Sequence, residues 1–251
     1  MDPQPVQGTS RNSMKSLSEL TVKIFADGAD KAGMVEMYRN PLIKGFTTNP
    51  TLMRKAGLSD YEAFALEVLE AIPDRPISFE VFSDDFAEMA RQAHKIAAWG
   101  ENVYVKIPVT NTRAESSAPL VRDLARAGVK LNVTAVFTLE QVRDISAALA
   151  EGPSACVSIF AGRIADSGRD PVPHMAAAVQ LLRVYPNIEL IWASPRELLN
   201  IFHADAIGCH IITATNDILK KLHLVDKELQ AYSLETVKMF HDDAQKAGFT
   251  L

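Results

Sequence analysis

The sequence predicts an α/β fold, a single-domain (β/α)8 TIM barrel with an additional C-terminal helix. Short apolar runs alternate along the chain with amphipathic segments whose apolar residues recur near i, i+3, i+4 and i+7. Such alternation is typical of a parallel sheet covered by helices, and eight repeats of about 25 residues favour a closed barrel over an open doubly wound sheet. No G-x-G-x-x-G or G-x-x-x-x-G-K-[ST] motif follows a strand, which also argues against the open sheet.

Eight segments have the length and composition of buried strands, and they cover residues 22–26, 45–49, 77–82, 103–109, 130–137, 155–162, 188–194 and 209–215. Helical patterns between them cover residues 61–72, 84–99, 118–128, 138–151, 173–185 and 195–206. Ser59, Ser83 and Thr138 are predicted helix N-caps because each precedes a first turn that contains Asp or Glu.

Two more segments, 219–224 and 234–248, follow the eighth strand. The last helix lies beyond what a minimal barrel needs, so we expect it to cover a barrel end or to reach a neighbouring subunit. The protein is therefore predicted to be a homo-oligomer, with dimer, pentamer and decamer all compatible. The predicted domain organisation is a flexible N-terminal tail, residues 1–20, and a barrel that includes the C-terminal helices, residues 21–251.

Composition excludes several classes of function. The chain of 251 residues carries a net charge of −5 and has no basic run, so a nucleic-acid partner is not expected. No apolar run reaches the roughly 20 residues that span a bilayer, and the N-terminus has no signal-peptide pattern. Cys156 and Cys209 lie in apolar stretches and are predicted to be buried free thiols of a cytoplasmic protein. No His or Cys cluster has metal-ligand spacing, so no metal or other cofactor is expected.

Polar residues stand near the carboxyl ends of nearly all the predicted strands, where barrel enzymes form their active sites. In strand order they are Asp27; Thr47, Thr48 and Asn49; Glu80; Lys106; Asn132 and Thr134; Ser158 and Arg163; and Ser194 and Arg196. Each alone is compatible with a structural role, and Glu80 with Lys106 is compatible with a structural ion pair. Their gathering at one end of one barrel favours an active site.

Lys106 interrupts the strand VYVKIPVT, in which Val105, Ile107 and Val109 alternate with it and are expected on the opposite face. Burial disfavours the charged form of an amine, and a neutral amine can attack a carbonyl to form a Schiff base. The resulting iminium accepts electrons when a neighbouring carbon–carbon bond breaks. Asp27 and Glu80 are the carboxylates available to move protons in such a reaction.

Arg163 and Arg196 indicate an anion site at the other end of the substrate. Guanidinium groups bind phosphate oxygens in a bidentate way. Arg196 follows Ser194 in a segment predicted to begin a helix, where backbone N–H groups would add to the binding of an anion. Either arginine alone is compatible with a surface ion pair, but together with Ser194 they favour phosphate.

The strings ADGAD, GFTTNP, SFEVFS, VYVKIPVT, LNVTAVFT, VSIFAGRI and WASPR resemble, in this order, the strand-end motifs of transaldolases. The resemblance extends over residues 22–215 and implies a class I aldolase barrel with Lys106 as the Schiff-base nucleophile. It implies Asp27 as the acid–base residue and Glu80 with Thr134 as a water relay. The implied substrate-binding residues are Thr47, Asn49, Asn132, Ser158, Phe160, Arg163, Ser194 and Arg196.

The substrates implied by this resemblance are sugar phosphates. A dihydroxyacetone unit would pass from a ketose phosphate to an aldose phosphate, as in the pentose phosphate pathway. The related fructose-6-phosphate aldolases tend to have Gln and Tyr where this chain has Glu80 and Phe160, so the resemblance favours the transaldolase branch. An aldolase that releases free dihydroxyacetone, a specialised sugar-phosphate variant and a non-catalytic sugar-phosphate-binding barrel remain alternatives. Gly28 and Pro195 depart from the usual family residues and leave the acceptor preference open.

Overall fold

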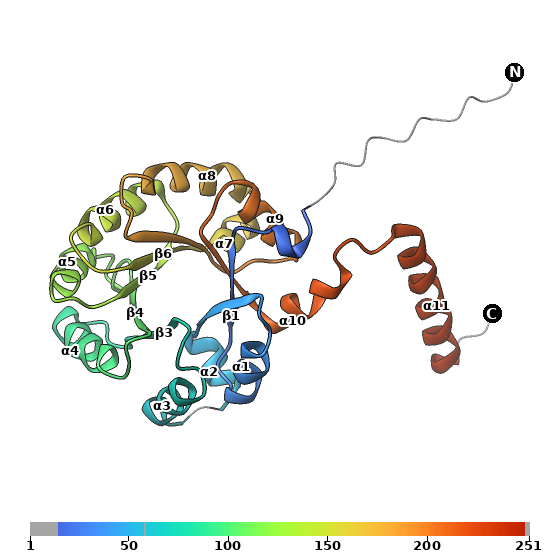
Figure 1. Ribbon diagram of the computed structural model, residues 1–251, viewed down its shortest axis with the longest axis horizontal. Coiled ribbons are helices and arrows are strands. Elements are labelled where there is room, and N and C mark those ends of the chain that lie inside the picture. The colour runs from blue at the N-terminus through green and yellow to red at the C-terminus, as the bar shows by residue number, and fades with distance from the viewer. Residues whose placement is uncertain (1–14, 58, 249–251) are drawn as a thin grey trace, which may run out of the picture. The chain divides into compact units, whose positions relative to one another are not determined.

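The computed structural model, which describes residues 15–57 and 59–248, confirms the predicted (β/α)8 barrel. Its eight strands are parallel and pair in sequence order, and β8 pairs with β1 to close the sheet (Figure 1). The strands are β1 (Lys23–Asp27), β2 (Ile43–Thr47), β3 (Ile77–Glu80), β4 (Val103–Pro108), β5 (Leu131–Val136), β6 (Ala155–Ile159), β7 (Ile188–Trp192) and β8 (Ile211–Thr215).

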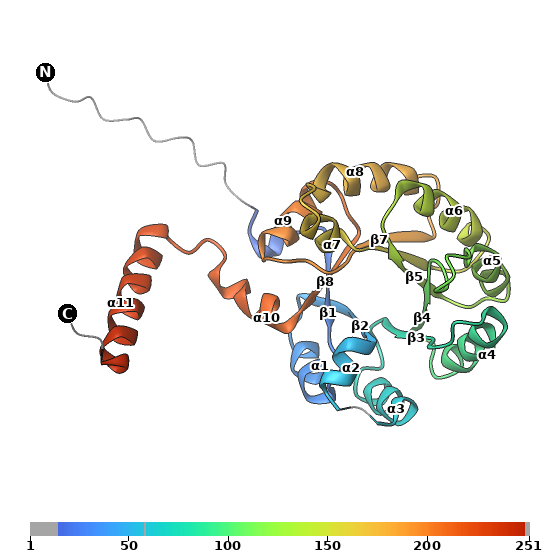
Figure 2. The ribbon, with the colours of Figure 1, turned by 180° about the vertical axis from the view of Figure 1, so that it is seen from behind.

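Helices surround the strands of the barrel, as the front and rear views show (Figures 1 and 2). The barrel helices are α1 (Lys31–Tyr38), α2 (Pro50–Lys55), α3 (Tyr61–Ala71), α4 (Phe86–Ala97), α5 (Ala118–Arg126), α6 (Leu139–Leu149), α7 (Ala161–Asp166), α8 (Pro171–Leu182), α9 (Leu199–Ala206) and α10 (Asn216–Leu219). The described chain also contains the short 3-10 helices η1 (Leu17–Glu19) and η2 (Lys220–Leu224) and the C-terminal helix α11 (Leu229–Ala247).

The chain divides into two compact units, of which residues 21–220 form the barrel. The described part of the other unit comprises residues 15–20 and 221–248 and contains the predicted C-terminal helix, α11. Glu228 caps α11 by accepting from the backbone of Gln230 and Ala231, and the helix ends at Gly248 in a left-handed conformation. The N-terminal tail that is predicted to be flexible consists largely of residues 1–14, which lie outside the described residues. The extension of the barrel domain to residue 251 stays a prediction.

Local hydrogen bonding moves several predicted boundaries. Asp60 and Asp85, rather than the predicted Ser59 and Ser83, cap α3 and α4, because their carboxylates accept from the backbone N–H three residues on. Ser83 Oγ instead accepts from the backbone N–H of Asp85. Thr138 caps α6 as predicted, accepting from the N–H of Gln141.

Other boundaries differ as well. β2 ends at Thr47 rather than residue 49, because Asn49 caps α2 by accepting from the N–H of Leu52. β6 ends at Ile159 rather than residue 162, because α7 begins at Ala161. The helix predicted from residue 195 begins only at Leu199.

The barrel register places polar residues of neighbouring strands side by side. Glu80 of β3 pairs with Lys106 of β4, which pairs in turn with Asn132 of β5. Val105 and Ile107, which alternate with Lys106, are completely buried. Cys156 and Cys209 are buried free thiols, as predicted. Within residues 15–57 and 59–248, no helix combines the length and apolarity needed to cross a membrane.

Candidate active site

A cavity of about 680 Å³ at the carboxyl ends of the strands brings the predicted site residues together. Its walls include every residue expected to be catalytic or substrate-binding: Asp27, Thr47, Asn49, Glu80, Lys106, Asn132, Thr134, Ser158, Phe160, Arg163, Ser194 and Arg196. These residues are up to about 170 positions apart in the chain, and barrel closure is what makes them neighbours.

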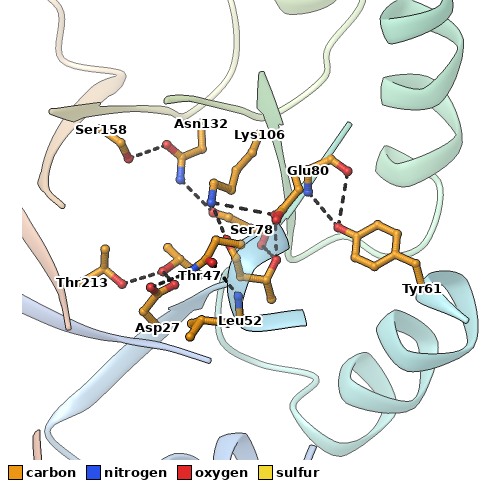
Figure 3. A network of polar contacts seen from close by, with 12 residues as sticks. Asp27, Thr47, Leu52, Tyr61, Ser78, Glu80, Lys106, Asn132, Ser158 and Thr213 are labelled. Carbon is orange, nitrogen blue, oxygen red and sulfur yellow. Dashed lines mark hydrogen bonds and ion pairs between the residues drawn. The ribbon is translucent and has the colours of Figure 1, made fainter. Parts of the chain in front are cut away.

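Lys106 reaches into this cavity from β4, and the residue is only 8% exposed. Its Nζ donates to the backbone carbonyl of Thr48 and lies 3.8 Å from Glu80 Oε2 (Figure 3). The amine is therefore held between a neutral acceptor and a carboxylate while facing the cavity.

Glu80 is 5% exposed, and its Oε2 accepts from Thr48 Oγ1 at 2.9 Å. Burial raises the pKa of the Glu80 carboxyl, and the nearby Lys106 opposes that shift. Its other oxygen, Oε1, is buried and has no hydrogen-bond partner in the described part of the chain.

Asp27 ends β1 and accepts two hydrogen bonds, from Thr47 Oγ1 at 2.8 Å and from Asn49 Nδ2 at 2.9 Å. Because the single Thr47 hydroxyl proton points at Asp27, the Thr213 hydroxyl 2.6 Å away donates to Thr47. Burial raises the pKa of the Asp27 carboxyl, opposed chiefly by Lys106. A carboxyl with a raised pKa can both take and return a proton near neutral pH.

A second chain of hydrogen bonds fixes the amide of Asn132. Ser158 Oγ donates to Asn132 Oδ1 at 2.7 Å, and Asn132 Nδ2 donates to Ser78 Oγ at 3.0 Å (Figure 3). Thr134 lies two residues further along β5 and also lines the cavity.

The two arginines have different environments. Arg163 in α7 is exposed, and its guanidinium carbon lies 5.6 Å from the centre of the Phe160 ring. Arg196 forms a bidentate ion pair with Asp166, at 2.9 and 2.5 Å. Its Nη1 also donates to the carbonyl and hydroxyl oxygens of Ser194. The Arg196 guanidinium holds the pKa of the Asp166 carboxyl below its usual range.

The helical setting predicted for Arg196 is wrong, because Ser194–Arg196 forms a loop before α9. Ser194 has a φ of 58°, an uncommon conformation for a residue other than glycine. Its carbonyl approaches Gly162 so closely that a Cβ there would lie 1.6 Å from the oxygen. The loop is thus seated directly on the start of α7.

Comparison with known proteins identifies the family. The model of the family Transaldolase/Fructose-6-phosphate aldolase matches residues 24–251. The chain belongs to this family. A probable transaldolase of Dehalococcoides mccartyi is 33% identical over 202 residues, which cover 80% of this chain and 90% of the relative. A probable transaldolase of Thermoanaerobacter sp. is 32% identical over 231 residues, 92% of this chain and all of the relative.

Solved structures outside the transaldolase family share only the fold. Dihydrodipicolinate synthase from Rhodopseudomonas palustris aligns with a TM-score of 0.55 at 14% identity, covering 92% of this chain and 81% of that one. A 2,3-dimethylmalate lyase aligns with a TM-score of 0.53 at 14% identity, covering 93% of this chain and 86% of that one. At this level of identity they support the barrel architecture of the transaldolase-family protein and nothing about its substrate.

Several cavity residues of this transaldolase-family protein were not predicted from the sequence. β8 and α10 contribute Thr213, Thr215, Asp217 and Ile218. The alternation in CHIITAT places Thr213 and Thr215 on one face, and that signal could have identified them. The backbone carbonyl of Thr48 accepts from Lys106, and the hydroxyl of Tyr61 contacts the backbone of Glu80. No pattern in the sequence indicates either contact.

In residues 15–57 and 59–248, no three His, Cys, Asp or Glu side chains are grouped as metal ligands.

Proposed function

We propose that the protein is a transaldolase that transfers a dihydroxyacetone unit between sugar phosphates through a Schiff base on Lys106. The observation that carries the proposal is the buried Lys106 amine, which faces the cavity beside two carboxyls with raised pKa values. Family membership supports an enzyme of the aldolase type. We further propose that it is a cytoplasmic homo-oligomer of the pentose phosphate pathway that needs no cofactor.

In the proposed reaction the neutral Lys106 amine adds to the C2 carbonyl of the ketose phosphate. The carbinolamine loses water to give a protonated imine, with Glu80 and Thr134 moving protons through a water. Asp27 then takes the proton of the C4 hydroxyl, the C3–C4 bond breaks and the aldose phosphate leaves. The electron pair of that bond passes into the iminium and leaves an enamine on Lys106.

The second half of the reaction reverses these steps. The C3 carbon of the enamine attacks the carbonyl carbon of the acceptor aldose, and Asp27 returns its proton to the new C4 hydroxyl. Water then hydrolyses the imine and releases the new ketose phosphate. Arg163, Arg196 and Ser194 would hold the phosphate, and Asn49, Asn132 and Ser158 the dihydroxyacetone hydroxyls.

The transfer reaction is favoured over release of free dihydroxyacetone by Phe160, which lines the cavity. A tyrosine hydroxyl in its place could direct proton transfer to the enamine, and a phenyl ring cannot. The alternative, an aldolase that releases dihydroxyacetone, shares the family and the lysine chemistry.

Borohydride reduction in the presence of fructose 6-phosphate tests the proposed Schiff base. We expect a stable mass adduct on the peptide that contains Lys106. Lys106→Arg serves as the control, because a guanidinium stays protonated and cannot attack a carbonyl. If the wild-type protein forms no adduct under conditions in which it is folded, the proposal is wrong.

Product analysis separates transfer from release. With fructose 6-phosphate alone a transaldolase stops after one half-reaction, whereas added erythrose 4-phosphate allows turnover to sedoheptulose 7-phosphate. Free dihydroxyacetone produced equally fast without the acceptor would instead establish the aldolase alternative.

A further inference from the structure

The hydrogen-bond ladder between β2 and β3 is interrupted beside Lys106. Thr48 N–H donates to the Ser78 carbonyl at 3.2 Å, which continues the parallel pairing of the two strands. In a regular parallel ladder, the Thr48 carbonyl would next accept from the N–H of Glu80. Among the described residues, the Glu80 N–H instead donates to Tyr61 Oη at 2.8 Å (Figure 3). The Thr48 carbonyl accepts from Lys106 Nζ.

Tyr61 is rigidly placed for this contact. It is the first residue of α3, and its ring makes near-perpendicular contacts with Phe79, Phe82 and Trp99 at centroid distances of 6.1, 4.7 and 5.7 Å. Burial raises the pKa of the Tyr61 phenol, so the group stays a neutral hydroxyl at working pH. Tyr61 does not line the cavity and is therefore not placed to touch the substrate.

We propose that Tyr61 is a positioning residue for Lys106. Because the Tyr61 hydroxyl accepts from the N–H of Glu80, the Thr48 carbonyl remains free to accept from the lysine amine. This inference rests on the proposed Schiff-base function and adds a residue to it. A protonated imine on Lys106 keeps one N–H, and the Thr48 carbonyl is the acceptor next to that nitrogen. The same arrangement keeps the amine 3.8 Å from Glu80 rather than in a closer ion pair.

Removal of the hydroxyl should change this arrangement without removing the ring. In Tyr61→Phe the Glu80 N–H loses its partner and is free to pair with the Thr48 carbonyl, as in a regular ladder. Lys106 would then lose its neutral acceptor and move toward the Glu80 carboxylate, which makes the amine a poorer nucleophile. Trp99→Phe is the matched control, because it disturbs the same aromatic cluster and leaves the hydroxyl in place.

Two rates measure the effect in folded wild-type protein and both variants. One is the rate of borohydride trapping with fructose 6-phosphate, and the other is reductive methylation of Lys106 by formaldehyde and cyanoborohydride. The methylation rate is read by peptide mass spectrometry against exposed Lys31 and requires no sugar chemistry. We expect both Lys106 rates to fall about tenfold in Tyr61→Phe, while KM for fructose 6-phosphate changes less than twofold. Both rates should stay within twofold of wild type in Trp99→Phe.

The inference is overturned if Tyr61→Phe reacts like wild type, or if both variants lose rate in proportion to their lowered melting temperatures. A wild-type protein that forms no sugar adduct would refute the proposed function. A Lys106 methylation rate that still depends on the Tyr61 hydroxyl would then support the positioning role separately. Should Tyr61→Phe fold poorly, 3,5-difluorotyrosine at position 61 keeps the ring and weakens the hydroxyl as an acceptor. It should lower both Lys106 rates, and unchanged rates would overturn the inference.

Discussion

Gly162→Ala should damage the phosphate end of the cavity and the fold together. The added Cβ would lie 1.6 Å from the Ser194 carbonyl oxygen, 2.7 Å from the Ser194 carbonyl carbon and 3.3 Å from Arg196 Cζ. Two of these atoms belong to the backbone, so a rotamer change cannot relieve the overlap. The loop would have to move by about 1.8 Å to restore an ordinary contact, and such overpacking typically costs 1–3 kcal/mol or more.

We expect a loss of about 3 kcal/mol in the free energy of unfolding, which lowers the melting temperature by about 6–12 °C for a domain of this size. The displaced loop carries Ser194 and Arg196, so KM for fructose 6-phosphate should rise at least about tenfold. Trapping of unphosphorylated dihydroxyacetone on Lys106 should change less than threefold, since β4 is not part of the displaced loop. Calorimetry and steady-state kinetics measure these quantities.

Gly28→Ala is the control for the loss of a glycine, because its Cβ would meet Met34 Cγ at an ordinary 3.4 Å. Its stability should stay within about 0.5 kcal/mol of wild type. A melting temperature of Gly162→Ala within about 2 °C of wild type would show that the Ser194 loop does not approach α7 as closely as described.

Three further predictions concern individual side chains. Arg163→Gln should raise KM for phosphorylated ketoses about 10–100-fold and leave dihydroxyacetone trapping unchanged; equal effects on both substrates would place the phosphate elsewhere. Glu80→Gln should unfold at a higher temperature than wild type at pH 8. This difference in melting temperature should vanish as the pH falls below the ordinary carboxyl pKa near 4.5, because a raised pKa in the native state makes ionisation of Glu80 destabilising only above that pH. A difference that widens in acid would contradict the raised pKa. Asp205→Ala should lose about 2–4 kcal/mol by denaturant unfolding, because Asp205 Oδ1 accepts from Thr21 N, Thr21 Oγ1 and Val22 N at the start of the barrel. Asp205→Asn, which keeps an acceptor oxygen, should lose less than half as much.

The strand order and the barrel could be predicted because burial on both faces leaves a strong local pattern. VYVKIPVT reads as a core strand from composition alone, and the Lys106 within it stands out for the same reason. Boundaries were less predictable, since a cap depends on which side chain reaches the free N–H groups. Asp60 reaches the N–H of Ala63, and nothing in the residue types distinguishes it from the neighbouring Ser59.

The short helices α1, α2 and α7 were not among the predicted segments. α7 has six residues, too few to show a helical period, and its first residues continue the apolar run of β6. Barrel contacts, rather than intrinsic propensity, decide the structure of such a segment.

The sequence by itself determined the fold class, the family resemblance and many of the residues that face the cavity, because alternation along each strand is a local property. Only the tertiary structure decided how those residues are paired. The ion pair of Arg196 with Asp166, the Thr213–Thr47–Asp27 chain and the contact of Tyr61 with the Glu80 backbone each join residues of different elements, 19 to 166 positions apart in the chain. Hydrogen bonds of this kind depend on ångström-scale placement of separate strands and helices, which no local pattern of residue types specifies.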